Sequence, residues 1–490
     1  MKTLCSALPL AGLCMVLAVP LGALADAHLK PCRVPGIKTE VQCGVLVRAL
    51  NPAQPGGVKI DIHYVVVPAL ARRKLPDPVF LLAGGPGQSA ISVAPMVVQQ
   101  MSRLGNRRDL VFVDQRGTGK SAPLMCAEDR SPSLAQQLDP SRREARLRQC
   151  LAELQKLSYG DLRFFTTTLA MQDVDAVRQA LGVSQVNLVG ASYGTRAALE
   201  YMRQFPQAVR RAVIDGVAPP DMALPSSASG DNQAALDALL AACERDPACQ
   251  RSYPSLRADW AAVLGRLPQD TVVAHPLTGE LQAVRITREA VLGSVRGPLY
   301  APALAAALPY AVQQAAQGRF EALLGLSTLL GGGRGPNRLA EGMHFSVVCA
   351  EDLGSQGRAA LPPGADFGDA FAELYQRTCA YWPRGVVPTT FYTVPRSQVP
   401  VLVLSGGLDP VTPPRHGERV AQALGAKARH VVVPHAGHGV MNPACMRDVL
   451  FRFIDAPDDA AASAVDVSCA ANIPRPPAFL PVQFAPQGKP

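Results

Sequence analysis

Apolar runs alternate with amphipathic stretches between Cys43 and about residue 217. The apolar runs, which are typical of buried strands, read VKIDIHYVVV (58–67), PVFLLAGG (78–85), DLVFVDQ (109–115), VNLVG (186–190) and RAVIDGV (211–217). Helix-like stretches such as LAMQDVDAVRQALG (169–182) separate them. Strands that alternate with helices predict an α/β fold whose mostly parallel central sheet is covered by helices on both faces.

The pattern changes between residues 218 and 395. This region is rich in alanine and leucine, has helix-like segments at 232–244 and 301–316, and lacks repeated buried strands. Strands return at VPVLVLSGG (399–407) and RHVVVP (429–434), before a helix-like stretch at 445–454. We therefore expect a core in two parts (26–217 and 396–460), a helical cap inserted at 218–395, and a proline-rich tail (461–490) in extended form.

The N-terminus has the pattern of a signal peptide over residues 1–25. Lys2 precedes an apolar stretch that Pro9 and Pro20 interrupt and that ends in Ala-Leu-Ala. These prolines and the small residues favour cleavage over the alternative, a retained membrane anchor. No later segment reads as a membrane span. The expected location is a periplasm or the extracellular medium.

Ten cysteines follow the expected cleavage site: Cys32, Cys43, Cys126, Cys150, Cys243, Cys249, Cys349, Cys379, Cys445 and Cys469. An even number in an exported chain indicates disulfides. We expect neighbours along the chain to pair, because each such pair closes a short loop. A zinc site is the alternative, but the sequence has no C-x-x-C pair and does not interleave these cysteines with histidines.

The chain has 490 residues and a net charge of +9, a balance found in proteins that bind nucleic acid or anionic surfaces. Its lysines and arginines are scattered and interrupted by acids or apolar residues. A solvated basic surface is therefore the preferred interpretation, and no nucleic-acid partner is expected.

Ser192 lies in the turn LVGASYG, between a strand-like run and a helix-like run. Gly190 and Gly194 remove the β-carbons that would collide across so sharp a turn. The pentapeptide G-x-S-x-G is also a common turn composition, but its strand–turn–helix setting predicts a nucleophilic serine.

A serine nucleophile needs a histidine to accept its proton and an acid to orient that histidine. His438, in a glycine-rich loop just after the strand at 429–434, is the predicted base, and His435 is the local alternative. Asp409 directly follows the strand at 399–407 and is the predicted acid. Asp215 also ends a strand, but it lies in a shorter loop, and a turn-capping role is preferred for it.

The oxyanion formed by serine attack requires two backbone N–H donors. Tyr193 follows the nucleophile and supplies one. The second is expected in FLLAGGPGQS (80–89), from Gly85 or Gly84. This loop lacks the Lys-Ser/Thr ending of a phosphate-binding loop, which favours acyl chemistry.

Seven segments together resemble the proline iminopeptidase and tripeptidyl aminopeptidase branch of the α/β-hydrolase superfamily, including its C-terminal segment. They are CGVLVRALNPAQPG (43–56), AGGPGQS (83–89), VFVDQRGTGKS (111–121), GASYG (190–194), FSVVCAED (345–352), GGLDPVTP (406–413) and HAGHG (435–439). The resemblance implies an α/β-hydrolase fold. It also implies that Asp114 and Arg116 support the glycine loop, and that Glu351 and Asp352 bind a substrate ammonium group.

The resulting hypothesis is an exported serine hydrolase that releases one residue, such as proline, or a tripeptide from the free amino end of a short peptide. No metal or organic cofactor is required for this chemistry. The alternatives are a carboxylesterase that uses the same triad and a non-catalytic envelope scaffold. Oligomeric state is left open by the sequence.

Overall fold

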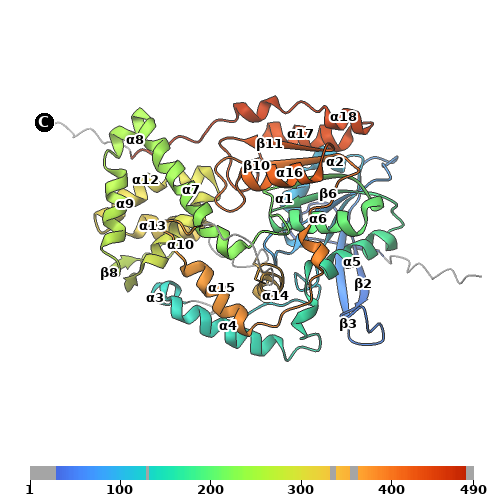
Figure 1. Ribbon diagram of the computed structural model, residues 1–490, viewed down its shortest axis with the longest axis horizontal. Coiled ribbons are helices and arrows are strands. Elements are labelled where there is room, and N and C mark those ends of the chain that lie inside the picture. The colour runs from blue at the N-terminus through green and yellow to red at the C-terminus, as the bar shows by residue number, and fades with distance from the viewer. Residues whose placement is uncertain (1–28, 128–131, 331–337, 354–361, 482–490) are drawn as a thin grey trace, which may run out of the picture.

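The computed structural model describes residues 29–127, 132–330, 338–353 and 362–481. The expected signal peptide, and with it Cys5 and Cys14, lies outside the described residues, as do the last nine residues of the tail. Figure 1 shows two parts side by side: a large α/β core and a smaller, mainly helical cap built around α7, α9, α10, α12 and α13.

A nine-stranded sheet forms the centre of the core, in the order β1-β2-β3-β5-β4-β6-β7-β10-β11. The strands are β1 (Lys30–Cys32), β2 (Val41–Ala49), β3 (Lys59–Val67), β4 (Val79–Leu82), β5 (Leu110–Val113), β6 (Val186–Ala191), β7 (Val209–Asp215), β10 (Val401–Gly406) and β11 (Ala428–Val433). The strands from β5 to β11 pair in parallel, whereas β1, β2 and β3 pair antiparallel at one side. The predicted α/β fold with a mostly parallel sheet is confirmed.

Alternate side chains of each central strand enter two separate hydrophobic clusters, one on each face of the sheet. In β4, Phe80 and Leu82 face one cluster, while Val79 and Leu81 face the other. Helices α5 (Thr167–Ala180), α6 (Tyr193–Gln204) and α16 (Pro414–Leu424) pack on the first face, and α1 (Ala90–Gln100), α2 (Ser102–Gly105) and α17 (Ala444–Asp455) pack on the second. Burial of both faces explains why these strands are continuous apolar runs. Short elements η1 (Leu162–Phe164), η2 (Pro206–Ala208), α18 (Asp459–Ser463) and η4 (Ser468–Asn472) complete the core.

The cap has its own hydrophobic cluster. Its elements from the inserted segment are α7 (Leu224–Arg245), α8 (Pro247–Ser252), α9 (Leu256–Gly265), β8 (Gln269–Ala274), β9 (Leu281–Ile286), α10 (Arg288–Leu299), α11 (Pro302–Ala305), α12 (Leu308–Ala316), α13 (Glu321–Leu330), α14 (Glu341–Glu351), α15 (Ala370–Tyr381) and η3 (Thr389–Tyr392). The sequence predicted no strands here, but β8 and β9 form an antiparallel hairpin. Val273, Val284 and Ile286 bury its inner face in the cap cluster. Only one face is buried, so the short strands lack the continuous apolar run that marks the core strands.

Two helices from the first half of the chain connect the core with the cap. They are α3 (Leu134–Leu138), which packs in the cap cluster, and α4 (Pro140–Leu154), whose buried residues belong to the first core cluster. Leu134 is part of the cap cluster, and its N–H donates to Gln282 Oε1 on β9 at 2.8 Å. The cap is therefore built from two separate parts of the chain.

Five disulfides pair the ten described cysteines in chain order, as the sequence led us to expect: Cys32–Cys43, Cys126–Cys150, Cys243–Cys249, Cys349–Cys379 and Cys445–Cys469. The sequence separations run from 6 to 30 residues. Cross-links that close loops of this size each stabilise a fold by about 2–4 kcal/mol. All ten sulfurs are bonded, so none of them is available to zinc.

The described part of the tail runs from the core across the cap without regular secondary structure after η4. Phe479 N–H donates to Ala306 O at 2.8 Å, and Tyr253 donates its hydroxyl to Phe479 O. The Phe479 ring meets the ring of Tyr310 edge-on at 5.3 Å. Hydrogen bonds and a ring contact therefore fix the end of the described chain to the cap.

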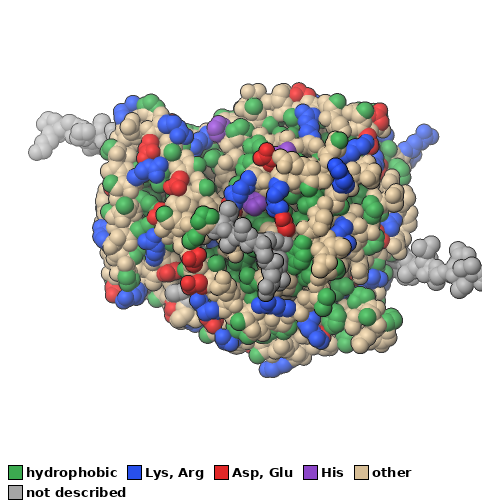
Figure 2. All heavy atoms as spheres, viewed as in Figure 1, with side chains coloured by type: hydrophobic (Ala, Val, Ile, Leu, Met, Phe, Trp, Pro, Cys, Tyr) green, Lys and Arg blue, Asp and Glu red, His purple; other side chains and the backbone are tan. Residues whose placement is uncertain are grey.

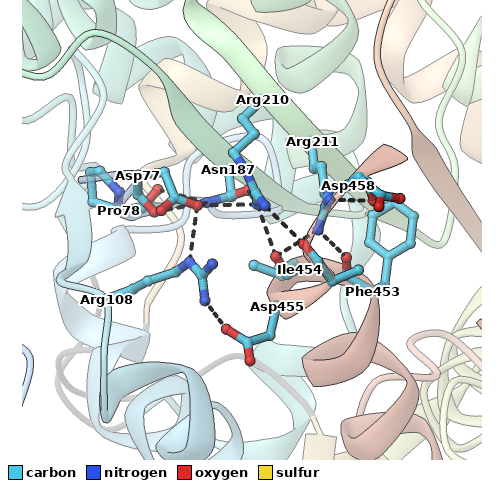
Figure 3. Close-up of polar contacts among 11 residues, drawn as sticks. Asp77, Pro78, Arg108, Asn187, Arg210, Arg211, Phe453, Ile454, Asp455 and Asp458 are labelled. Atoms are coloured by element: carbon cyan, nitrogen blue, oxygen red, sulfur yellow. Dashed lines mark hydrogen bonds and ion pairs between the residues drawn. The ribbon is translucent and has the colours of Figure 1, made fainter. Parts of the chain in front are cut away.

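A polar network lies at the edge of the sheet where β4, β5, β6 and β7 begin (Figure 3). Arg211 donates to the carbonyls of Phe453 and Ile454 at 2.7 and 2.8 Å, and also to Asp458 O at 2.8 Å. Arg210 donates to Ile454 O at 2.9 Å. These carbonyls belong to the last turn of α17 and the residues after it, so the two arginines cap the negative end of that helix.

The surface carries charges of both signs. On the face drawn in Figure 2, lysines and arginines are spread over core and cap with acidic side chains between them. Within the described ranges, each helix lacks either the length or the apolar character that a bilayer crossing requires.

Candidate active site

A cavity of roughly 1220 Å³ lies where the C-terminal ends of the parallel strands meet the cap. Its core side is lined by residues that follow β4, β6, β7 and β10, together with the loop after β11. Open α/β sheets place their ligand sites at this edge. Ser192, Tyr193, Gly84, Gly85 and His438, five residues that the sequence singled out, line this cavity.

Ser192 occupies a strained turn between β6 and α6. Its backbone has φ 55° and ψ −124°, a conformation that non-glycine residues rarely adopt. A β-carbon on Gly194 would lie 2.0 Å from Leu82 O, and one on Gly190 would lie 2.3 Å from Gly194 O. The turn therefore needs both glycines, and it presents the serine side chain at the start of a helix.

His438 and Asp409 are hydrogen-bonded neighbours. His438 Nδ1 lies 2.9 Å from Asp409 Oδ2. Asp409 is buried, and it also accepts from the amides of Val411 and Thr412 and from the Thr412 hydroxyl, at 2.6 to 2.9 Å. A carboxylate fixed in this way holds the proton on His438 Nδ1 and leaves Nε2 as an acceptor.

The two groups shift each other's pKa. Burial alone would lower the pKa of His438, but the charge and hydrogen bond of Asp409, with Asp215 nearby, hold it above its usual value. Burial would likewise raise the pKa of Asp409, yet His438 and Thr412 hold it below its usual range. Each group therefore favours the charged form of the other.

The alternative acid and the alternative base lie elsewhere. Asp215 does not bind the imidazole; its carboxylate accepts from the amides of Val440 at 2.8 and 3.0 Å and of Met441 at 3.1 Å. Its backbone carbonyl accepts from Ser192 N–H at 2.8 Å. Asp215 therefore joins the serine turn to the loop that carries His438. His435 is exposed on the surface and does not line the cavity.

Asp215 is fully buried, and burial raises its pKa to about 6 despite the amides of Val440 and Met441 that favour its charged form. From the sequence, a turn-capping role is preferred for Asp215. Its contacts to two segments of the site make it a positioning residue as well.

The glycine loop after β4 approaches the serine closely. A β-carbon on Gly84 would lie 3.2 Å from Ser192 Cβ, and Gly85 has φ +109°. Gly84 N–H already donates to Gln88 Oε1 at 3.3 Å. Among the described residues, no acceptor is bonded to the amides of Gly85 and Tyr193. Of the two glycines that the sequence offered as oxyanion donors, Gly85 has the available N–H.

Asp114 supports the end of the glycine loop, as the resemblance implied. Its Oδ1 accepts from Ser89 Oγ at 2.6 Å and from Ile91 N–H at 3.1 Å, at the start of α1. The expectation for Arg116 is wrong. Arg116 donates to Asp173 at 2.7 and 3.0 Å and to two carbonyls on the other side of the strand. The chain leaves β5 at Val113 and turns at Arg116 and Gly117, so Asp114 reaches α1 on one face of the sheet while Arg116 reaches α5 on the other.

Glu351 and Asp352 lie at the end of α14, on either side of Arg196. Asp352 lines the cavity and accepts from Arg196 Nη1 at 2.5 Å. Glu351 does not line it; its carboxylate accepts from the Thr167 amide at 2.7 Å and the Thr167 hydroxyl at 2.9 Å. Burial raises the pKa of Glu351 to about 7, although Arg196 and Thr167 oppose the rise. Of the two acids, only Asp352 meets the cavity.

His344 is a cavity residue to which the sequence assigned no role. Its Nδ1 lies 3.2 Å from Pro86 O, which can only accept, so Nδ1 carries the proton. Its Nε2 then accepts from the Tyr375 hydroxyl at 2.7 Å. Burial lowers the pKa of His344 to about 4, so this chain of neutral groups braces the glycine loop from the cap side. No local pattern marks such a contact, because its three members are distant in sequence.

Comparison with known proteins gives the same fold. Residues 77–441 match the model of a family described as alpha/beta hydrolase fold. Serine protease Hip1 of Mycobacterium tuberculosis is 25% identical over 429 residues, which cover 80% of this chain and 82% of that protein. Carboxylesterase B of the same species is 26% identical over 430 residues, 79% of this chain and 78% of that protein.

A tripeptidyl aminopeptidase of Streptomyces lividans is 30% identical over 192 residues, which cover 37% of this chain and 36% of that protein. The family match spans most of the chain and includes Ser192, Asp409 and His438. The chain belongs to the α/β-hydrolase fold family.

Proposed function

We propose that this protein is an exported serine peptidase that releases short pieces from the free amino end of peptides. The observation that carries the proposal is the 2.9 Å contact between His438 Nδ1 and Asp409 Oδ2, in a cavity that Ser192 also lines. The relatives named serine protease and tripeptidyl aminopeptidase support peptide bonds as the target. The five disulfides support an oxidising compartment such as a periplasm or the extracellular medium.

In the proposed reaction, Ser192 Oγ attacks the scissile carbonyl carbon while His438 Nε2 accepts the hydroxyl proton. The C=O π electrons move to the oxygen, which the amides of Tyr193 and Gly85 stabilise. Collapse breaks the C–N bond, and His438 returns the proton to the leaving amine. Water then hydrolyses the acyl-enzyme by the same steps, again with His438 as base. Asp409 stays ionised and holds the imidazole in position.

Recognition of a free amino group is assigned to the acids beside Arg196. Asp352 lies on the cavity wall, where its carboxylate is shared between Arg196 and the substrate ammonium in this proposal. Glu351 lies behind it and acts on it through Arg196, with Nη1 3.6 Å from Glu351 Oε2. The two acids face one arginine, so the group retains negative charge once Glu351 ionises above its pKa of about 7.

A carboxylesterase with the same triad is the second candidate, favoured by the relative named carboxylesterase B. The deciding experiment compares aminoacyl and tripeptidyl anilides with their N-acetylated forms and with aryl acetates. We expect cleavage of the free-amine anilides and a loss of at least tenfold in kcat/KM on acetylation, because the buried acids lose their cationic partner. Equal rates for blocked and free anilides would contradict the aminopeptidase, and hydrolysis of esters alone would favour the carboxylesterase.

Labelling by a fluorophosphonate tests the enzyme against the non-catalytic scaffold. We expect the oxidised wild-type protein to be labelled and the Ser192→Ala protein not to be, because the probe reports an activated serine. Ser184→Ala is the matched control, since Ser184 is exposed in the turn before β6 and should leave labelling unchanged. A wild-type protein that is not labelled would support the scaffold.

A further inference from the structure

The cavity wall carries more cationic than anionic side chains. The lining residues with charge are Arg142, Arg143, Arg146, Arg196, Arg296 and Arg338 against Asp139, Glu153, Asp215, Glu341 and Asp352. Recognition of a free amino group explains the acids of this cavity. It does not explain the excess of arginine.

The carboxylates of the wall are already engaged. Glu341 accepts from Arg146 Nη2 at 2.7 Å, and Asp352 is bonded to Arg196. Asp139 caps Ser141, and Glu153 accepts from Gln149 at 3.0 Å. Asp215 is held by two backbone amides. By contrast, Arg143 and Arg296 form no ion pair with any carboxylate in the part of the chain that the structure describes.

Arg296 and Arg143 face the same aromatic wall from two helices. The Arg296 guanidinium lies 4.7 Å from the centre of the Phe371 ring, and that ring packs against Tyr375 at 4.8 Å. Both arginines act on the Tyr375 hydroxyl, since their charges oppose the rise in pKa that burial gives it. A guanidinium stacked on a ring keeps its in-plane N–H donors available, and these match a carboxylate in pairs.

This wall adjoins the reacting groups on both sides. Tyr375 bonds to His344, which bonds to Pro86 of the glycine loop. On the other side, Arg296 of α10 lies one helical turn before Tyr300, the residue that caps this helix, and Tyr300 O accepts from His438 N–H at 2.9 Å. The Tyr300 ring also meets the His438 ring edge-on at 5.2 Å. Arg296 therefore lies toward the side of the cavity where His438 returns a proton to the leaving amine, and Arg143 lines the same cavity near Tyr375 and His344.

We propose that Arg143 and Arg296 form a subsite that binds a carboxylate on the departing part of the substrate. This inference rests on the proposed peptidase function, because only a peptide offers such a leaving group beside a free amine. The carboxylate is the C-terminus of a short peptide or an acidic side chain near the cut. The enzyme then selects short peptides by both ends. The acids near Arg196 bind the amino group, and Arg143 and Arg296 bind the carboxylate.

Binding to the Ser192→Ala protein tests the subsite without any turnover. Tetra-alanine with a free C-terminus is compared with the same peptide as its C-terminal amide by calorimetric titration. We expect the acid to bind roughly 10- to 100-fold more tightly, since charge-assisted hydrogen bonds to two arginines are lost in the amide. Equal dissociation constants, or no binding of either peptide at millimolar concentration, would overturn the inference.

Variants test whether Arg143 and Arg296 cause the preference for the free acid over the amide. In Ser192→Ala protein, the added changes Arg143→Gln and Arg296→Gln should bring the ratio of the two dissociation constants close to one. Arg148→Gln is the matched control, because Arg148 lies on the same helix, pairs with Glu144 and packs over Tyr381. A preference that survives in the double arginine variant would overturn the inference, provided that thermal unfolding shows that the variant is folded.

A third peptide distinguishes the two sources of carboxylate. An amidated tetrapeptide that ends in glutamate regains tight binding if the subsite takes acidic side chains, and stays weak if it takes only the terminus. Either result is consistent with a carboxylate subsite. Wild-type protein that fails to cleave any of these peptides, although the Ser192→Ala protein binds the acid tightly, would contradict the proposed peptidase function and leave the subsite standing.

Discussion

The edge of the central sheet where its parallel strands begin and the edge where they end differ in how their polar groups are bonded. At the edge where the strands begin, Arg108, Arg210 and Arg211 donate to the carboxylates of Asp77 and Asp455 and to the carbonyls at the end of α17 (Figure 3). At the edge where the strands end, Ser192 sits in a strained turn, and the amides of Gly85 and Tyr193 are without an acceptor among the described residues.

The difference teaches how one sheet serves two purposes. Satisfied donors and a capped helix stabilise the fold, whereas strain and unused donors lower stability in order to keep groups ready for a substrate. Mutations at the first edge should change the free energy of unfolding with little effect on the rate constant. Mutations at the second should do the reverse.

The largest expected effect is that of Asp409→Asn at the C-terminal edge. We expect kcat to fall by about 10⁴-fold, because the amide no longer fixes the imidazole tautomer. The Asp409 charge also holds the pKa of His438 above its usual value. Since His438 acts when neutral, loss of the Asp409 charge should lower the pKa of His438 and move the acidic limb of the kcat/KM profile to lower pH.

The measurement is a pH–rate profile on a free-amine anilide, with Asp448→Asn on α17 as the control. Asp448 is partly exposed and bonded only to surface arginines in the described chain. An acidic limb that stays in place, or a large fall in melting temperature with normal kcat, would contradict the role given to Asp409.

Arg211→Met should have the next largest effect, and on stability alone. Arg211 is buried, and its removal leaves the carbonyls of Phe453, Ile454 and Asp458 without this donor. We expect the free energy of unfolding to fall by about 3 kcal/mol, with kcat unchanged under folding conditions. Urea unfolding measures this loss of stability. The control is Arg285→Met, which removes an exposed ion pair with Asp270 and should lower the free energy of unfolding by less than about 0.5 kcal/mol.

Asp215→Asn should have the smallest effect, and it should lower both activity and stability. The amide offers a single acceptor to the amides of Val440 and Met441, so the loop that carries His438 is held less firmly. We expect kcat/KM to fall by about tenfold and stability by about 1 kcal/mol. The pKa of Asp215 is about 6, so the wild-type carboxyl is itself neutral below that pH.

The ratio of wild-type to Asp215→Asn activity is therefore expected to be largest above pH 6 and to shrink as the pH falls through 6. A ratio that is constant across this range would mean that the charge of Asp215 has no part in positioning the loop. Rates are compared at several pH values on protein that circular dichroism shows to be folded.

Much of the fold could be predicted because the parallel strands are buried on both faces and stand out as apolar runs. The elbow at Ser192 and the loops of Asp409 and His438 could be placed because parallel strands end at one edge. The β8–β9 hairpin could not, since about half of its side chains face solvent and its strands lack a continuous apolar run. Nor could the division of work between Glu351 and Asp352, which depends on which helix face meets the cavity.

The contacts that sequence reasoning missed join residues far apart in the chain. His344, Pro86 and Tyr375 form one hydrogen-bonded chain, and Arg143 and Arg296 reach one wall from different helices. The placement of α3 on the cap is of the same kind. Such pairings are decided by tertiary packing, and no periodicity or local motif encodes them.

The tail that leaves the core at η4 and is bonded to Ala306 and Tyr253 has a mechanical consequence. It gives the cap a third connection to the core, made by hydrogen bonds and a ring contact, in addition to the inserted segment and the path through α3 and α4. A lobe anchored by several strands of backbone resists swinging on a single hinge. We therefore expect the cavity entrance to keep a nearly constant width, which would admit slender substrates more readily than folded proteins.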